Sequence, residues 1–186
     1  MDRPEPVDEG APMFDDNLSD LLILVDENDR QIGAAPKLQA HQEALLHRAF
    51  SVFLFDQDGR MLLTRRAPGK YHSGGLWTNA CCSHPRDGET LAEAVPRRLA
   101  EELGVSDCPC REVGSFVYRA DFANGLTEHE LDHVFVGEWS QDVTPDPQET
   151  SEIAWLAVEA VRRQLDHHPE RFTAWFAPAF ALATQI

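Results

Sequence analysis

Short apolar runs separated by polar turn residues dominate the first third of the chain. Residues 21–26 and 31–33 flank a polar tetrapeptide and predict a short hairpin. Residues 48–56 (RAFSVFLFD) are apolar on both faces, which is typical of a strand buried on both sides of a sheet. An Asp-Gly pair within residues 57–60 then predicts a turn into another strand over residues 61–66.

The remainder of the chain adds both strands and helices. The apolar pattern predicts strands over residues 76–82, 113–122 and 131–139 and helices over residues 158–165 and 170–183. Because most of the strands follow one another in hairpin order, we expect a single α+β domain with a mixed sheet flanked by helices. The sequence contains no internal repeat and no linker that would divide this domain.

One more helix is predicted over residues 90–103 by the signals at its two ends. Thr90 is a suitable N-cap, Glu93 follows three residues later, and Gly104 stands just past the last turn. Pro96 falls inside this helix. We expect it to kink the helix, since proline has no N–H to bond the carbonyl four residues earlier.

Length and charge narrow the class of protein. A chain of 186 residues suits one domain with a single core. Its 32 acidic and 16 basic residues give a formal net charge of −16, which argues against nucleic acid or an anionic membrane surface as partner, because both select basic faces. A small anionic substrate would need metal ions or a local cluster of Arg and Lys to receive it.

The ends of the chain and its cysteines indicate a cytoplasmic protein, which we expect to be monomeric. No apolar run approaches the ~20 residues needed to span a bilayer. Residues 1–20 are Pro-rich and acidic and lack the features of a signal peptide, so we predict a disordered tail before a domain over residues 21–186. The four cysteines stand in adjacent or near-adjacent pairs, which indicates reduced thiols.

The segment from Thr78 to Pro85 places a thiol two residues before an imidazole, as Cys82 and His84. From these residues alone, the cysteine could be a nucleophile, a proton carrier or a metal ligand. Its neighbour Cys81 is expected to be a small packing residue, since free cysteine is among the most buried residue types.

Carboxylates and further histidines offer a metal site. Glu128 and Glu130 alternate with His129 in a predicted strand, so the two carboxylates point to one side and the imidazole to the other. Three imidazoles and two carboxylates would make a five-ligand, octahedral-leaning site for Mn²⁺, Mg²⁺ or Zn²⁺. The candidate ligands are His41, His47, His84, Glu128 and Glu130.

The predicted helix carries a second motif. Glu89, followed after seven residues by Arg97 and the segment to Val105, resembles the Nudix signature, in which glutamates hold divalent metal against a diphosphate. For this segment alone, a solvated acidic helix face remains an alternative. The match is partial, because Ser83 stands where the pattern opens with Gly and Arg98 replaces a Glu. The lost carboxylate argues against efficient hydrolysis, which needs several carboxylates to gather Mg²⁺ and activate water.

Taken in order, five motifs resemble one family of the Nudix fold, the type 1 isopentenyl-diphosphate isomerases. The resemblance covers roughly residues 21–180. It is carried by His41, the segments Leu46–Phe55 and Leu63–Arg66, the segment Trp77–Pro85, and Glu128-His129-Glu130.

The resemblance implies a role for each matched residue. The five candidate ligands match the family's divalent-metal ligands, while Cys82 matches the catalytic thiol and Glu130 the catalytic carboxylate, with Tyr118 beside it. Glu102 matches a residue that helps to hold a second Mg²⁺ against the diphosphate, and Trp175 an aromatic residue near the hydrocarbon end of the substrate. The basic residues that would receive the phosphates are Lys37, Arg66, Lys70 and Arg98.

The expected reaction converts isopentenyl diphosphate to dimethylallyl diphosphate, a step in making isoprenoid precursors. Two other functions stay open. A Nudix hydrolase of a diphosphate-containing substrate would use the acidic helix, although Arg98 and the Cys82/His84 pair count against it. A non-enzymatic protein with a structural zinc site would use the histidines and would unfold on chelation.

Overall fold

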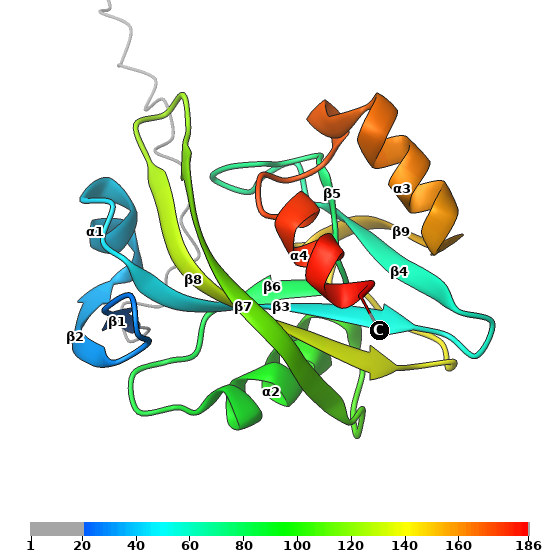
Figure 1. Cartoon of the computed structure of the whole chain (residues 1–186), viewed down its shortest axis with the longest axis horizontal. Helices are drawn as coiled ribbons and strands as arrows, with labels where there is room; N and C mark the ends of the chain where they lie inside the picture. Colours follow the sequence, from blue (N-terminus) through cyan, green and yellow to red (C-terminus); the bar gives the residue numbers. More distant parts are fainter. Residues whose placement is uncertain (1–20, 186) are drawn as a thin grey trace, which may run out of the picture.

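The computed structural model describes residues 21–185 of the protein. These residues form a mixed, strongly curved β-sheet with helices packed against it (Figure 1). The expected α+β architecture is confirmed. The strands are β1 (Leu21–Val25), β2 (Gln31–Pro36), β3 (His47–Phe55), β4 (Arg60–Arg66), β5 (Trp77–Thr78), β6 (Cys81–Ser83), β7 (Cys110–Asp121), β8 (Thr127–Glu138) and β9 (Thr150–Ala157). The helices are α1 (Lys37–Gln42), α2 (Leu91–Leu103), α3 (Val158–His167), the 3₁₀ turn η1 (Pro169–Arg171) and α4 (Phe176–Ala183).

Strand β3 is the centre of the sheet, as its apolar sequence predicts. It pairs antiparallel with β1, β4 and β6 and runs parallel to β8 over its whole length. The parallel register sets His47 opposite Glu130, while the antiparallel register with β6 sets Ser51 opposite Cys82. The central strand thus brings together residues from distant parts of the chain.

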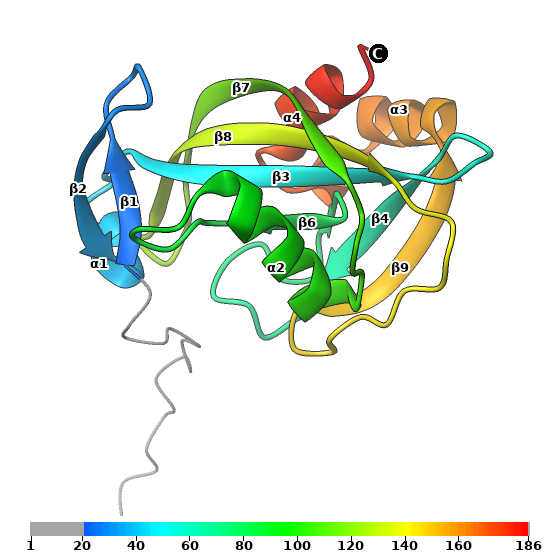
Figure 2. The same ribbon diagram turned by 90° about the horizontal axis from the view of Figure 1, so that it is seen from below.

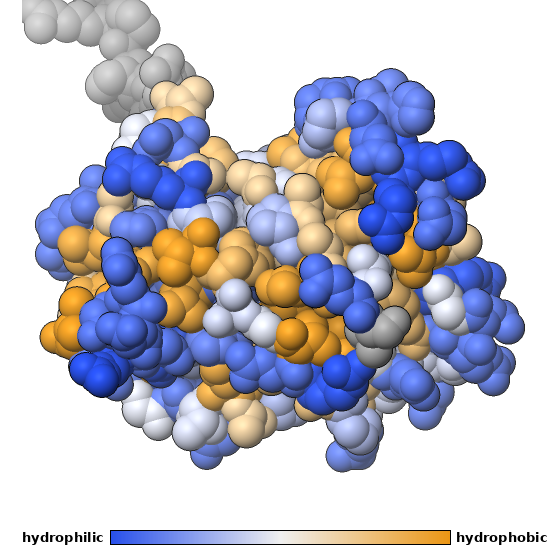
Figure 3. Space-filling model, viewed as in Figure 1, coloured by the Kyte–Doolittle hydropathy of each residue, from blue (hydrophilic) through white to orange (hydrophobic). Residues whose placement is uncertain are grey.

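Helices cover both faces of the sheet (Figure 2). On one face, α2 packs Leu99 and Leu103 against the side chains of Phe50 and Leu54 from β3. On the other face, the phenylalanines of α4 pack with Phe53 and Met61. On the face seen in Figure 3, hydrophilic residues alternate with apolar areas. No helix within residues 21–185 is long and apolar enough to cross a membrane.

The ends of α2 lie as predicted. Thr90 and Glu93 form a reciprocal capping box, and Gly104 ends the helix in the left-handed conformation at φ 66°. The helix continues through Pro96 in its second turn. Two neighbouring acidic residues of α2 take different environments: Glu102 is buried, and Glu101 is exposed.

The strand predicted over residues 76–82 is wrong, because β5 and β6 pair with different strands. β5 pairs with β4 and β6 pairs with β3, so the chain crosses between them at Asn79 and Ala80. The Asn79 side chain stabilises the crossing by donating to the carbonyls of Val52 and Cys81, at 3.0 and 2.8 Å.

The helix predicted over residues 170–183 is also interrupted, at Thr173. Its backbone N–H donates to the Trp77 carbonyl at 3.0 Å and its hydroxyl to Thr78 Oγ1 at 3.1 Å. These bonds dock the segment on β5 and delay the start of α4. Helix α1 and strand β9 were not predicted, and the proposed tail over residues 1–20 lies outside the described residues.

Candidate active site

A cavity of about 760 Å³ opens between the β7–β8 hairpin, the loop after β4 and the N-terminal end of α4. The predicted catalytic and basic residues all line it, together with two predicted metal ligands and the predicted aromatic residue. The lining candidates are Lys37, Arg66, Lys70, Cys82, His84, Arg98, Tyr118, Glu128, Glu130 and Trp175. Three further candidates, His41, His47 and Glu102, are buried.

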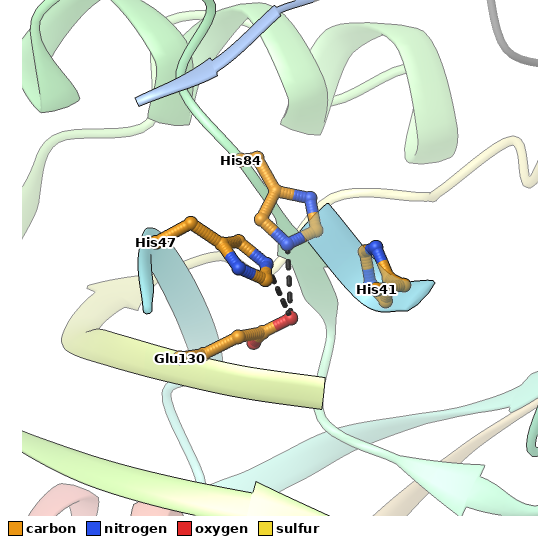
Figure 4. Close-up of side chains that lie close together, drawn as sticks. All are labelled: His41, His47, His84 and Glu130. Carbon is orange, nitrogen blue, oxygen red and sulfur yellow. Dashed lines mark hydrogen bonds and ion pairs between the residues drawn. The ribbon is translucent and has the colours of Figure 1, made fainter. Parts of the chain in front are cut away.

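Three imidazoles converge on one carboxylate beside this cavity (Figure 4). His41 comes from α1, His47 from the start of β3 and His84 from the segment after β6, while Glu130 lies on β8. Glu130 Oε1 lies 3.0 Å from His84 Nε2 and 3.4 Å from His47 Nε2. One ligand atom from each of the four residues lies within 4.8 Å of the others.

The orientation of the rings fits a bound cation. The Nδ1 atoms of His41 and His47 lie 2.7 and 2.8 Å from the carbonyl oxygens of Lys37 and Leu45, which turns each Nε2 inward. Both Nε2 atoms are buried and make no hydrogen bond within residues 21–185, and that of His47 has only the 3.4 Å ion-pair contact with Glu130. Burial lowers the pKa of His41 to about 4 and that of His84 to about 3, so these rings are neutral near pH 7. Neutral imidazoles with free lone pairs and a carboxylate suit a divalent metal.

The two glutamates of β8 point to the same side, as the alternation of the strand predicts. The Tyr118 hydroxyl, on the paired strand β7, donates to Glu130 Oε2 at 2.6 Å and lies 3.2 Å from Glu128 Oε2. His129 faces the other way, with Nδ1 3.0 Å from the Ala44 carbonyl. Burial and the neighbouring charge of Glu130 raise the pKa of Glu128 well above its ordinary value. Burial acts in the same direction on Glu130, but His84 and His47 outweigh it and hold the pKa of Glu130 well below the ordinary value.

Cys82 presents its thiol in a closely packed polar environment. Its Sγ donates to Asn79 Oδ1 at 2.9 Å and accepts from Trp175 Nε1 at 2.9 Å. Burial raises the pKa of this thiol to about 12, so it stays protonated at neutral pH. A neutral thiol can exchange a proton but is a poor nucleophile and a poor metal ligand. The neighbouring Cys81 is buried in the core against α2, which confirms its expected packing role.

The basic residues of the cavity are paired with other side chains. The Arg66 guanidinium lies over the Trp175 ring, 5.4 Å from its centroid, and the Lys37 ammonium lies 4.9 Å from the Tyr71 centroid. Arg98 Nη2 lies 2.5 Å from Glu102 Oε1. Arg98 thus lines the cavity from α2 and Arg66 from the end of β4, whereas Lys37 comes from α1, the helix that also carries His41.

Two loop residues were missed by the sequence analysis. His72 Nε2 lies 2.9 Å from Glu128 Oε1, and its ring stacks on Phe122 at 4.5 Å. Glu149 pairs with two of the basic residues. Neither lies in a periodic segment, so no local signal in the sequence indicates its position.

Two strand residues were also missed, although the sequence did carry a signal for one of them. Asp132 continues the alternation of Glu128 and Glu130 and is buried on the same side of β8. Its Oδ2 accepts from Ser51 Oγ at 2.7 Å, and that hydroxyl lies 3.7 Å from Cys82 Sγ. Ser51 and Asp132 thus extend the polar environment of the thiol.

Comparisons with known proteins agree with this arrangement. The family model described as NUDIX domain matches residues 45–176. An isopentenyl-diphosphate Delta-isomerase of Burkholderia multivorans is 50% identical over 159 residues, covering 86% of this chain and 90% of the relative. The isopentenyl-diphosphate Delta-isomerase of Streptomyces griseus is 51% identical over 159 residues, covering 84% of this chain and 79% of the relative.

Solved structures share the fold at lower sequence identity. The crystal structure of DR0079 from Deinococcus radiodurans superposes with a TM-score of 0.72 at 21% identity, covering 89% of this chain and 99% of that one. A MutT protein from Methanosarcina mazei gives a TM-score of 0.60, also at 21% identity, over 73% of this chain and 91% of that one. With the fold and the sequence relatives in agreement, the chain belongs to the type 1 isopentenyl-diphosphate Delta-isomerase family of the Nudix superfamily.

Proposed function

We propose that this protein converts isopentenyl diphosphate to dimethylallyl diphosphate. The observation that carries the proposal is the pair of groups lining one cavity that can exchange protons, the protonated thiol of Cys82 and the hydrogen-bonded carboxylate of Glu130. Relatives with about half of their residues identical bear the name of this isomerase. The basic side chains that line the same cavity supply a place for a diphosphate.

The residues suit the chemistry of moving a double bond. The reaction adds a proton to carbon 4 and removes one from carbon 2, through a state with tertiary carbocation character. In our proposal Cys82 and Glu130, the latter held by Tyr118, are the two proton carriers on opposite faces of the substrate. The protonated thiol can give its proton to carbon 4, and the ionised carboxylate can take the proton from carbon 2. A thiol that stays protonated until it is needed does not attack the carbocation-like carbon, so no covalent intermediate is required.

Trp175 is proposed to stabilise the cationic state. Its indole N–H donates a hydrogen bond to Cys82 Sγ, and this bond holds the ring beside the thiol that takes part in proton transfer. An aromatic face near a desolvated cation contributes about 2 kcal/mol or more. The Arg66 guanidinium over the same ring supports a position at the junction between the hydrocarbon and diphosphate ends of the cavity.

The metal centre is proposed to hold Mn²⁺, Mg²⁺ or Zn²⁺. His41, His47, His84 and Glu130 would bind the ion, with Glu128 as the fifth ligand. A bound divalent cation would supply positive charge next to the Glu130 carboxyl group and so tune its acidity. Each ring reaches the centre from a different element, which explains why the site depends on the folded domain.

The diphosphate is proposed to bind to the basic residues that line the cavity, Lys37, Arg66, Lys70 and Arg98. Glu102 would hold a second Mg²⁺ against the phosphates. This arrangement explains how a protein with a formal net charge of −16 accepts an anionic substrate. The Arg98–Glu102 ion pair also argues against a hydrolase. Arg98 stands in place of one carboxylate of the Nudix signature and forms an ion pair with another, Glu102.

Product analysis separates these functions. Purified protein is incubated with isopentenyl diphosphate, and in parallel with nucleoside diphosphate derivatives, while allylic product and released phosphate are measured. We expect dimethylallyl diphosphate without phosphate release. Glu130→Gln should abolish the reaction while thermal unfolding and circular dichroism stay those of the parent protein. Rapid release of phosphate would contradict the isomerase proposal and support a hydrolase.

A further inference from the structure

Glu149 is the acidic partner of two basic residues that line the cavity. Its carboxylate forms an ion pair with Lys70 and lies 3.5 Å from Arg98 Nη2. Arg98 is in turn paired with Glu102 through two nitrogens, at 2.5 and 3.0 Å. Glu149 lines the cavity with its side chain 20% exposed, whereas Glu102 is buried and does not line it. Two of the four cations proposed to bind the diphosphate are therefore already neutralised.

The backbone holds Glu149 between the two elements that carry these cations. The Asp146 N–H donates to the carbonyl of Glu102 in the last turn of α2, at 2.8 Å, and Glu149 N–H donates to the Asp146 carbonyl at 3.0 Å. On its other side, the Glu149 carbonyl accepts from the Ala67 N–H at 2.9 Å. Glu149 thus reaches Lys70 and Arg98 from a fixed backbone position rather than from a free loop.

This placement has an electrostatic consequence for an entering diphosphate. The phosphates must lie beside the carboxylate that already pairs with Lys70 and Arg98, or displace it from both. Repulsion between anions a few ångströms apart is strong in a cavity that is only partly hydrated. A divalent cation carried by the diphosphate offsets this repulsion, whereas a metal-free diphosphate bears all of it.

We propose that Glu149 is a specificity-determining residue that makes the cavity select metal-bound diphosphates over metal-free diphosphates. The inference rests on the proposed function, since it assumes that Lys70 and Arg98 receive the substrate's phosphates. Glu149 lies outside the acidic helix α2, so the residues that control diphosphate binding are not confined to that helix. Glu149 acts here through its charge and its fixed position, without touching the reacting carbons.

Calorimetric binding of inorganic pyrophosphate to the metal-loaded protein tests the proposal. The parent protein, Glu149→Gln and Glu152→Gln are titrated in buffer freed of Mg²⁺ by a chelating resin and again in saturating Mg²⁺. Glu152 is a matched control because it stands three residues away and pairs with Arg65, which does not line the cavity. We expect Glu149→Gln to bind Mg²⁺-free pyrophosphate about tenfold more tightly than the parent protein does. The increase in affinity on adding Mg²⁺ should be correspondingly smaller than in the parent protein.

The controls separate the possible failures. In Glu152→Gln the affinity for pyrophosphate should depend on Mg²⁺ as it does in the parent protein. Glu149→Asp retains the negative charge and should keep most of that dependence. If Glu149→Gln weakened the affinity for pyrophosphate equally with and without Mg²⁺, Glu149 would have only a structural role and the inference would be overturned. An affinity whose dependence on Mg²⁺ is unchanged would overturn it as well. If Glu149→Gln does not fold, Glu149→Ser is judged by the same two titrations. A parent protein that neither binds pyrophosphate nor isomerises its substrate would instead overturn the proposed function.

Discussion

Removal of the Tyr118 hydroxyl should slow the reaction without disturbing the fold. This hydroxyl is the donor to Glu130 Oε2 at 2.6 Å and also lies 3.2 Å from Glu128. A hydrogen bond to a charged group contributes about 1.5–3 kcal/mol. Because about 1.4 kcal/mol corresponds to a tenfold change in rate, Tyr118→Phe should lower kcat by about tenfold to a hundredfold.

The assay is steady-state conversion of isopentenyl diphosphate, accompanied by metal analysis and thermal unfolding. We expect KM to change little, because Tyr118 contacts the carboxylate pair rather than the basic end of the cavity. Val117→Ala is the control, since this neighbour on β7 is 49% exposed, and it should leave kcat unchanged. A kcat for Tyr118→Phe equal to that of the parent protein, with metal retained, would refute the role of this hydroxyl in supporting Glu130.

Four further outcomes are expected. Cys82→Ala should lower kcat by at least about a hundredfold while the protein stays folded, and full activity would exclude the thiol as proton carrier. Glu102→Gln should raise the KM for substrate and weaken its dependence on Mg²⁺, so an unchanged Mg²⁺ requirement would remove this glutamate from the diphosphate site. Removal of metal by chelation should abolish activity with little change in circular dichroism, because the two largest hydrophobic core clusters of the described residues form without the metal-site histidines. Unfolding on chelation would favour the structural zinc hypothesis. Gly137→Ala should destabilise the protein by about 1–3 kcal/mol in thermal or denaturant unfolding, since its Cβ would lie 2.9 Å from Cys110 Sγ, and an unchanged midpoint would contradict this packing argument.

Local signals in the sequence predicted the elements that local forces determine. The capping residues fixed both ends of α2, and the alternation along β8 predicted that Glu128 and Glu130 share a side. The family resemblance supplied His41 and Trp175, which no periodic pattern would have singled out. The structure brings both to the site.

The features that were missed depend on contacts between distant segments. The break between β5 and β6 follows from the crossing of the chain between two partner strands, and the delayed start of α4 follows from the bonds of Thr173 to β5. His72 and Glu149 lie in loops whose positions are set by residues far away in the sequence, Glu128 in one case and Lys70 in the other. Such contacts leave no trace in periodicity or in residue propensity.

The central claim is that Glu130 and Cys82 exchange protons with the carbon skeleton of the substrate. Conversion of isopentenyl diphosphate in deuterated water, followed by analysis of the product, tests it directly. We predict dimethylallyl diphosphate with deuterium at the newly formed methyl group, and little or no labelled product from Cys82→Ala or Glu130→Gln in the time in which the parent protein completes the reaction. Product free of deuterium, or equal labelling by either variant, would contradict the account.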